Sequence, residues 1–247
     1  MTFTVNGHPV HVETRAPNGP ARLDELLPAL RAIDDRLIEA VVALHEKAGE
    51  RISCRKGCSA CCRVQPVPVT PPEAVALARL VEALPEPRRR AVHASFAAAR
   101  ERLRTAGLYD VFIRRDPGIT RETASAAAHR YIGLGLTCPF LIDDVCSIYP
   151  DRPFVCRQYF VTSPPELCTA PLDNPVKPVK MPARFATALL KAVEALNGSA
   201  QYTVPLVLAL DYAEANRDEL ARPHDAKEAF GKVMDSLRES AGTPTDK

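Results

Sequence analysis

The chain has 247 residues, 46% of them hydrophobic, and its formal charges nearly balance at +2. A chain of this length and composition can fill its own hydrophobic core. It therefore does not belong to the small proteins that need a metal in order to fold. The near balance of charge gives no reason to expect a nucleic-acid partner. No apolar run approaches the ~18 residues of a membrane span, so we expect no membrane partner either.

The beginning of the chain predicts a hairpin followed by a long helix. Residues 1–20 contain two short β-type runs joined through Asn6 and Gly7, which predict a small β-hairpin and then a linker. After the linker, apolar residues recur at helical spacing, so that residues 21–50 predict one long amphipathic helix. Pro28 should either kink this helix or mark where its main body starts.

Helices are also expected in the middle and at the end of the chain. Residues 70–131 predict a helical insert that opens on Thr70-Pro-Pro-Glu73, a capping box with proline at the first helical position. Residues 183–240 predict C-terminal helices. The rest of residues 51–168 shows little periodicity. We therefore predict a mainly α fold, in which the whole chain forms one helical domain around an irregular cysteine-rich metal-binding core, with a small N-terminal β-hairpin.

The eight cysteines are unevenly placed, because seven of them fall into two tight groups. The first group is Cys54-x3-Cys58-x2-Cys61-Cys62, the second is Cys138-x7-Cys146-x9-Cys156, and Cys168 follows. Thiolates grouped in this way bind soft metals such as zinc or the iron of iron–sulfur clusters. We therefore take all eight cysteines as candidate metal ligands.

A disulfide framework is the other interpretation of eight cysteines. The adjacent pair Cys61-Cys62 and the length of the chain weigh against it. Residues 1–12 have neither the basic nor the apolar region of a secretory leader, so we expect a cytoplasmic protein whose thiols stay reduced. A metal site therefore explains the cysteines better than disulfide bonds do.

The first cysteine group cannot hold a single zinc ion on a straight helix. Cys54 and Cys61 would then lie about 10 Å apart along the helix axis, whereas the sulfurs of one zinc site lie within roughly 4 Å of one another. Gly57 offers a break at which Cys54 could fold back. Otherwise, the group must serve a larger cluster or two ions.

Charged and aromatic side chains accompany the second group. Arg152 and Arg157 lie close to Cys156 in the sequence, and cations of this kind stabilise an anionic thiolate centre. Tyr149 and Tyr159 flank the same stretch and should pack with their hydroxyls near the metal. We expect these four residues to surround the ligands without binding the metal themselves, and we assign no catalytic residue.

Both cysteine blocks resemble a known family. The motifs Cys54-x3-Cys58-x2-Cys61-Cys62, Cys138-Pro-Phe-Leu141, Cys146-Ser-Ile-Tyr149 and Arg152-Pro-x2-Cys156-Arg157 are similar in order and spacing to those of the YkgJ-type cysteine-cluster family, over roughly residues 51–168. The resemblance implies chelation of zinc or iron, often as an iron–sulfur cluster. A weaker resemblance to the cysteine motif of flagellin lysine methylases implies methyl transfer as one chemistry.

The choice of metal stays open between two readings. The clustered candidates are all sulfur, as in a [4Fe–4S] or related iron–sulfur cluster, and seven or eight thiols exceed the needs of one zinc. Two zinc sites with four thiolates each would also use eight cysteines. We favour an iron–sulfur cluster used in redox or group-transfer chemistry. The alternative is a zinc-stapled, non-catalytic module that stabilises the fold or presents a surface to a partner.

Overall fold

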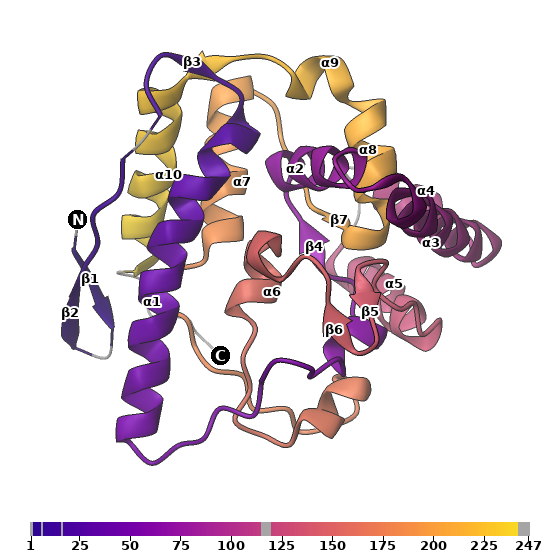
Figure 1. Cartoon of the computed structure of the whole chain (residues 1–247), viewed down its shortest axis with the longest axis horizontal. Coiled ribbons are helices and arrows are strands. Elements are labelled where there is room, and N and C mark those ends of the chain that lie inside the picture. The colour runs from indigo at the N-terminus through magenta and orange to yellow at the C-terminus, as the bar shows by residue number, and fades with distance from the viewer. Residues whose placement is uncertain (1, 6, 16, 115–119, 242–247) are drawn as a thin grey trace.

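The structure is a computed structural model that describes residues 2–5, 7–15, 17–114 and 120–241. Within these residues helices dominate, and every sheet consists of two short strands (Figure 1). The predicted mainly α class is therefore confirmed. None of the described helices combines the length and the apolar character that crossing a membrane requires.

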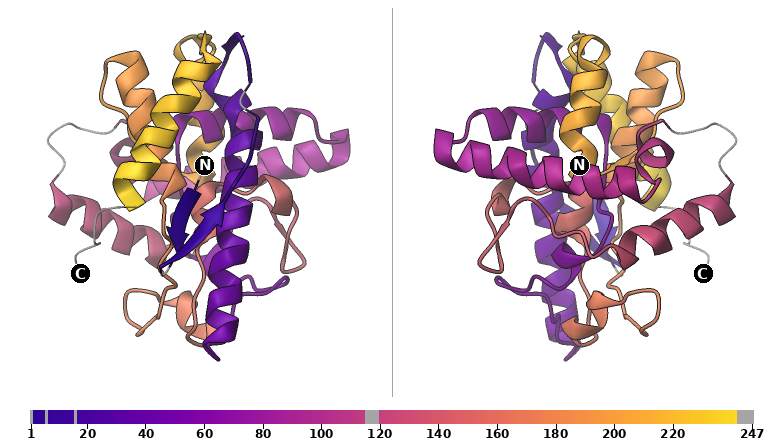
Figure 2. Two further views of the ribbon diagram at one scale, coloured as in Figure 1. Left: turned by 90° about the vertical axis from the view of Figure 1, so that its left-hand side faces the viewer. Right: turned by 90° about the vertical axis from the view of Figure 1, so that its right-hand side faces the viewer.

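One layer of the molecule packs three long helices together. These are α1 (Leu27–Lys47), α7 (Phe185–Asn197) and α10 (Ala226–Ala241), which lie side by side in Figure 1. The predicted N-terminal hairpin is confirmed: β1 (Thr2–Val5) pairs antiparallel with β2 (His8–His11) and covers this layer, as the left view of Figure 2 shows. Asn6, expected in its turn, lies outside the described residues.

Helix α1 forms because its apolar residues recur every three to four positions. Leu30, Ile33, Leu37 and Val41 are all at most 3% exposed and form one face of the helix. Burying each such side chain contributes roughly 1.5–3 kcal/mol, which favours this face of the helix against α7 and α10. Pro28 lies in the first turn of α1, after a 3-10 turn at residues 23–26, so it marks the start of the helix body.

A second group of helices forms the other side of the molecule. It comprises α2 (Pro71–Glu82), α3 (Glu86–Thr105), α4 (Tyr109–Ile113), α5 (Arg121–Gly133), α8 (Ala209–Ala215) and α9 (Arg217–Leu220). Helices α2 and α8 pack closely, and the long α3 runs across the molecule in the right view of Figure 2. The short helices α4 and α9 were not predicted, since four or five residues give no clear periodicity.

The cysteine-rich segment runs between these two groups of helices. It includes the hairpin of β5 (Leu141–Ile142) and β6 (Val145–Cys146), and the short helix α6 (Phe154–Gln158), which touches α1, α7 and β4 (Figure 1). Two further ladders join distant segments: β4 (Pro68–Val69) with β7 (Val204–Pro205), and β3 (Pro20–Ala21) with β8 (His224–Asp225). These ladders therefore join segments that lie far apart in the sequence.

Candidate metal centre

Seven of the eight cysteines line one cavity of about 150 Å³. They are Cys54, Cys58, Cys61, Cys62, Cys138, Cys146 and Cys156. They come from three pieces of chain: the loop 54–62, the segment 138–146 and helix α6. The structure thus brings the two groups together although about eighty positions separate them in the sequence.

Backbone conformation explains how the first group reaches the cavity. Gly57 has a φ of +88°, a left-handed conformation that glycine adopts without strain, and it reverses the chain between Cys54 and Cys58. Cys61 and Cys62 then lie in a 3-10 turn over residues 61–63. The break expected at Gly57 is therefore present, and four cysteines face one cavity without a straight helix.

Direct hydrogen bonds join the two cysteine groups. The backbone N–H of Cys138 donates to the carbonyl of Cys62 at 2.7 Å. The tip of the β5–β6 hairpin is tied to the first group as well, because Ser59 donates to the Asp144 carboxylate at 2.5 Å and Arg63 forms an ion pair with it. These contacts hold the hairpin that carries Cys146 against the loop that carries Cys58 to Cys62.

Burial controls the protonation of the thiols. Desolvation raises the pKa of Cys54 and Cys146, and it raises that of Cys138 to about 12. The thiol of Cys61 hydrogen-bonds the sulfur of Cys62, which raises the pKa of Cys61 and lowers that of Cys62 to about 7. Most of these sulfurs are therefore neutral thiols near pH 7 in the metal-free protein, and a metal that binds them must displace protons.

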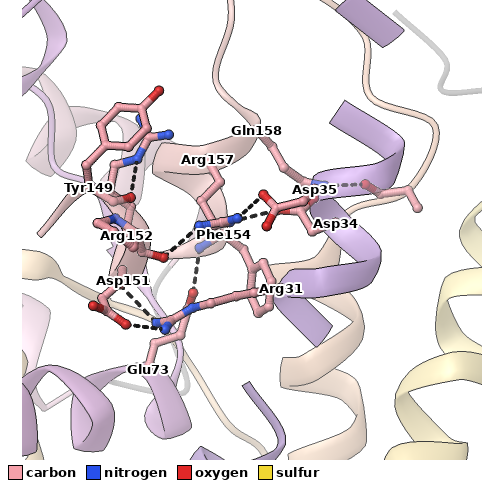
Figure 3. Close-up of polar contacts among 12 residues, drawn as sticks. Arg31, Asp34, Asp35, Glu73, Tyr149, Asp151, Arg152, Phe154, Arg157 and Gln158 are labelled. Carbon is pink, nitrogen blue, oxygen red and sulfur yellow. Dashed lines mark hydrogen bonds and ion pairs between the residues drawn. The ribbon is translucent and has the colours of Figure 1, made fainter. Parts of the chain in front are cut away.

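Arg152 and Tyr149 lie at the edge of the cavity, and both line it. The guanidinium of Arg152 stacks over the ring of Tyr149 at 3.7 Å, and its Nε donates to the Tyr149 carbonyl at 3.1 Å (Figure 3). The positive charge of Arg152 lowers the pKa of Cys62 and opposes the rise at Cys54, Cys146 and Cys156. The charge of Arg152 therefore favours the thiolate form of these sulfurs.

Cys168 and Tyr159 lie together on one side of the site. Cys168 is 3% exposed and does not line the cavity, although its charge would interact with Cys54 and Cys58. Tyr159 does line the cavity, and its hydroxyl accepts a hydrogen bond from Gln65 at 3.4 Å. Among the described cysteines, Cys168 is thus the one that does not line this cavity, although it lies close to Cys54 and Cys58.

Arg157 points away from the cavity. Its guanidinium donates to the Asp34 carboxylate at 3.2 Å and to the Pro150 carbonyl at 2.9 Å, and it pairs with Asp35 (Figure 3). Burial raises the pKa of Asp34 to about 7, while Arg157 opposes this rise. Arg157 therefore contacts helix α1 and not the cavity.

Sequence reasoning missed the partners of this segment. They are Arg31, Asp34 and Asp35 on α1, and Glu73 on α2. A signal for Asp34 was present, because it falls on the apolar face of α1, four positions after Leu30 and three before Leu37. A carboxylate at a position that the helical pattern buries indicates a specific cationic partner elsewhere in the fold.

The sulfurs surround a volume and do not converge on one point. Within the described parts of the chain, no three His, Cys, Asp or Glu side chains come close enough to hold one metal ion. The donor set is nevertheless suited to a soft metal, since seven thiols and no histidine line the cavity. The cavity is otherwise mostly apolar, with Val67, Leu136 and Leu206 among its lining residues.

Comparison with known families identifies this region. The family model CxxCxxCC, described as "putative zinc- or iron-chelating domain", matches residues 53–171. No curated protein and no solved structure matches the chain. The matched residues include both cysteine groups and Cys168. Residues 53–171 therefore match the cysteine-cluster family that the motifs predicted, and this match supports a metal-binding cysteine-cluster protein.

Proposed function

We propose that the seven cavity-lining cysteines hold an iron–sulfur cluster and that the protein uses it in redox or group-transfer chemistry. The observation that supports this proposal most directly is that seven thiols surround one cavity of about 150 Å³. A single ion needs three or four donors at one point, whereas a polynuclear cluster is held by thiols spread around its own volume. The arrangement of the sulfurs favours the second kind of centre.

The surrounding residues suit such a centre. Thiolates are the usual ligands of iron–sulfur clusters, and apolar side chains make up much of the rest of the cavity lining. The Arg152 guanidinium offsets part of the negative charge that several thiolates create. When bound, an iron–sulfur cluster supplies one-electron transfer or a metal site for a substrate. The methyl-transfer variant is supported by the sequence resemblance alone.

Two zinc ions are the second candidate, and the position of Cys168 is the observation that favours them. Cys168 lies near Cys54 and Cys58, so the eight cysteines could divide into two sets of four. In that case the metal would join distant segments and stabilise the fold without taking part in chemistry. The two candidates differ in whether Cys168 is required.

Metal analysis of anaerobically purified protein tests the proposal. We expect iron and acid-labile sulfide, with a broad visible absorption band that dithionite bleaches. Zinc at one or two equivalents with no visible band would overturn the proposal. Cys156→Ser should lose the visible band, because Cys156 lines the cavity. Cys168→Ala is the matched control: the cluster proposal expects it to keep the band, while the two-zinc candidate expects it to lose one zinc.

A further inference from the structure

The short segment that carries Cys156 cannot fix its own position. Cys156 lies in the five-residue helix α6, which follows a three-residue 3-10 turn over residues 149–151. Pro150 and Pro153 each remove a backbone donor from this stretch. Helices this short are not stable alone in water. The place of the Cys156 sulfur at the cavity therefore depends on contacts from other elements.

Side chains from α1 and α2 contact the residues that precede Cys156 in the sequence. Arg31 donates to the side chain of Asp151 at 2.8 Å and to its carbonyl at 2.9 Å. Glu73 accepts a hydrogen bond of 2.7 Å from the backbone N–H of Phe154, at the start of α6 (Figure 3). The chain is thus held five and two residues before the cysteine.

Asp34 contacts the residues that follow Cys156 in the sequence. Its carboxylate is fully buried and accepts from Arg157 at 3.2 Å and from Gln158 at 2.8 Å, the two residues directly after Cys156. Gln158 also donates to the Ala183 carbonyl at 2.9 Å, which ties the end of α6 to the segment before α7. Asp34 therefore sets where α6 ends, and with it the direction in which α6 presents Cys156.

A buried ion pair is weak evidence of stabilisation, because desolvation offsets much of its attraction. Asp34 and Arg157, with side chains 0% and 6% exposed, form such a pair. An apolar pair of similar volume would stabilise the same packing as well, but it would not fix the direction of the segment through the two directed hydrogen bonds that Asp34 accepts from Arg157 and Gln158. This contrast favours a geometric role for Asp34.

We propose that Asp34 is a positioning residue of the metal centre: it holds Cys156 at the cavity through Arg157 and Gln158, so that metal binding is coupled to the packing of helix α1. Asp34 lies outside residues 53–171, so the centre is completed by a helix that the family match does not include. The inference rests on the proposed metal centre. Linkage is reciprocal: if α1 favours metal binding, bound metal must stabilise the packing of α1 to the same extent.

Metal affinity of matched variants tests this role. We would titrate the full-length protein with Co²⁺ against a chelator and follow the sulfur-to-cobalt absorption band. Asp34→Asn removes the charge with little change of shape. We expect about tenfold weaker Co²⁺ binding and an altered absorption band. Losses of roughly 10- to 100-fold are typical when residues that hydrogen-bond or orient metal ligands are changed. Asp24→Asn is the control, because Asp24 is similarly buried and ion-paired, with Arg22 and Arg79, neither of which neighbours a cysteine.

Hydrogen exchange of the metal-free protein provides a second measurement. Asp34→Asn should speed exchange of the α6 amides about tenfold, while Asp24→Asn should leave them unchanged. Co²⁺ should slow exchange in α1 of the unchanged protein. If Asp34→Asn fails to fold, Asp151→Asn, at a half-exposed position, tests the same segment, with about threefold weaker binding expected.

The outcomes separate the two proposals. Unchanged affinity and band in Asp34→Asn, or an equal loss in Asp24→Asn, would overturn the positioning role. A wild-type protein that binds neither Co²⁺ nor iron would instead overturn the metal centre, while the exchange of α6 would still report whether Asp34 holds this segment.

Discussion

Replacing Glu73 with alanine should destabilise the protein far more than a typical helix-cap mutation. Glu73 is 1% exposed, and its carboxylate accepts three hydrogen bonds. Two come from the backbone N–H and hydroxyl of Thr70, at 2.8 and 2.7 Å, and the third comes from the N–H of Phe154 at 2.7 Å. One side chain therefore caps helix α2 and holds the start of α6.

The magnitude follows from the donors that would be left without a partner. Glu73→Ala leaves two buried backbone N–H groups unpaired, each costing about 1–3 kcal/mol, while the Thr70 hydroxyl can rotate toward another acceptor. Together with the lost packing, this gives roughly 3–6 kcal/mol, a large part of the ~5–15 kcal/mol by which domains are usually stable. Glu73→Gln keeps one acceptor oxygen and should cost about half as much.

Urea unfolding followed by circular dichroism measures these free energies. The chain offers a matched control in helix α5, where Thr123 accepts from the backbone N–H of Thr120 at 2.9 Å in the same relative positions, but exposed to solvent. Thr123→Ala should cost less than about 1 kcal/mol, because water can replace the lost acceptor. A loss below about 1 kcal/mol for Glu73→Ala would show that the buried hydrogen bonds do not have the role described above.

Two further predictions concern the cysteine loop and the thiols. Gly57→Ala should destabilise the protein by about 1 kcal/mol, because its φ of +88° strains any side chain although the space around it is open. Gly231→Ala is the control: it lies within helix α10 with no positive φ and should instead stabilise the protein by about 0.5–1 kcal/mol. Equal effects of the two substitutions in thermal melts would refute the argument. Burial raises the pKa of the Cys138 thiol from 9.0 to about 12, so this group adds stability below pH 9 that is lost as the pH rises toward 12. The metal-free protein should therefore lose stability over this range in melts at stepped pH. A difference in stability between Cys138→Ala and the wild-type protein that stays constant across this range would contradict the prediction.

Much of the fold is local in origin and could be read from the chain. The spacing of Leu30, Ile33, Leu37 and Val41 predicts α1, since residues three and four apart share a helix face. Thr70-Pro-Pro-Glu73 predicts the start of α2, which the structure places at Pro71. The grouping of the cysteines likewise predicts a soft-metal centre, because thiol chemistry does not depend on the fold.

The elements that the sequence did not predict are short or depend on distant partners. Helix α6 has only five residues, and its position depends on Glu73, which is 81 positions earlier than its partner Phe154. Arg157 was expected beside the metal ligands, because it adjoins Cys156 in the sequence. Its guanidinium instead pairs with Asp34 on α1, and Arg157 does not line the cavity. Adjacent residues on a helix point in different directions, so closeness in sequence did not indicate closeness to the cavity.

The sequence by itself indicated the long helices and a metal-binding cysteine cluster, because periodicity and ligand chemistry are properties of neighbouring residues. Only the tertiary structure decided that seven cysteines share one cavity while Cys168 lies beside it, and that Asp34 meets Arg157 from 123 positions away. Those choices depend on how the helical layers pack, since a buried carboxylate can be paired only by the cation that the completed fold brings to it.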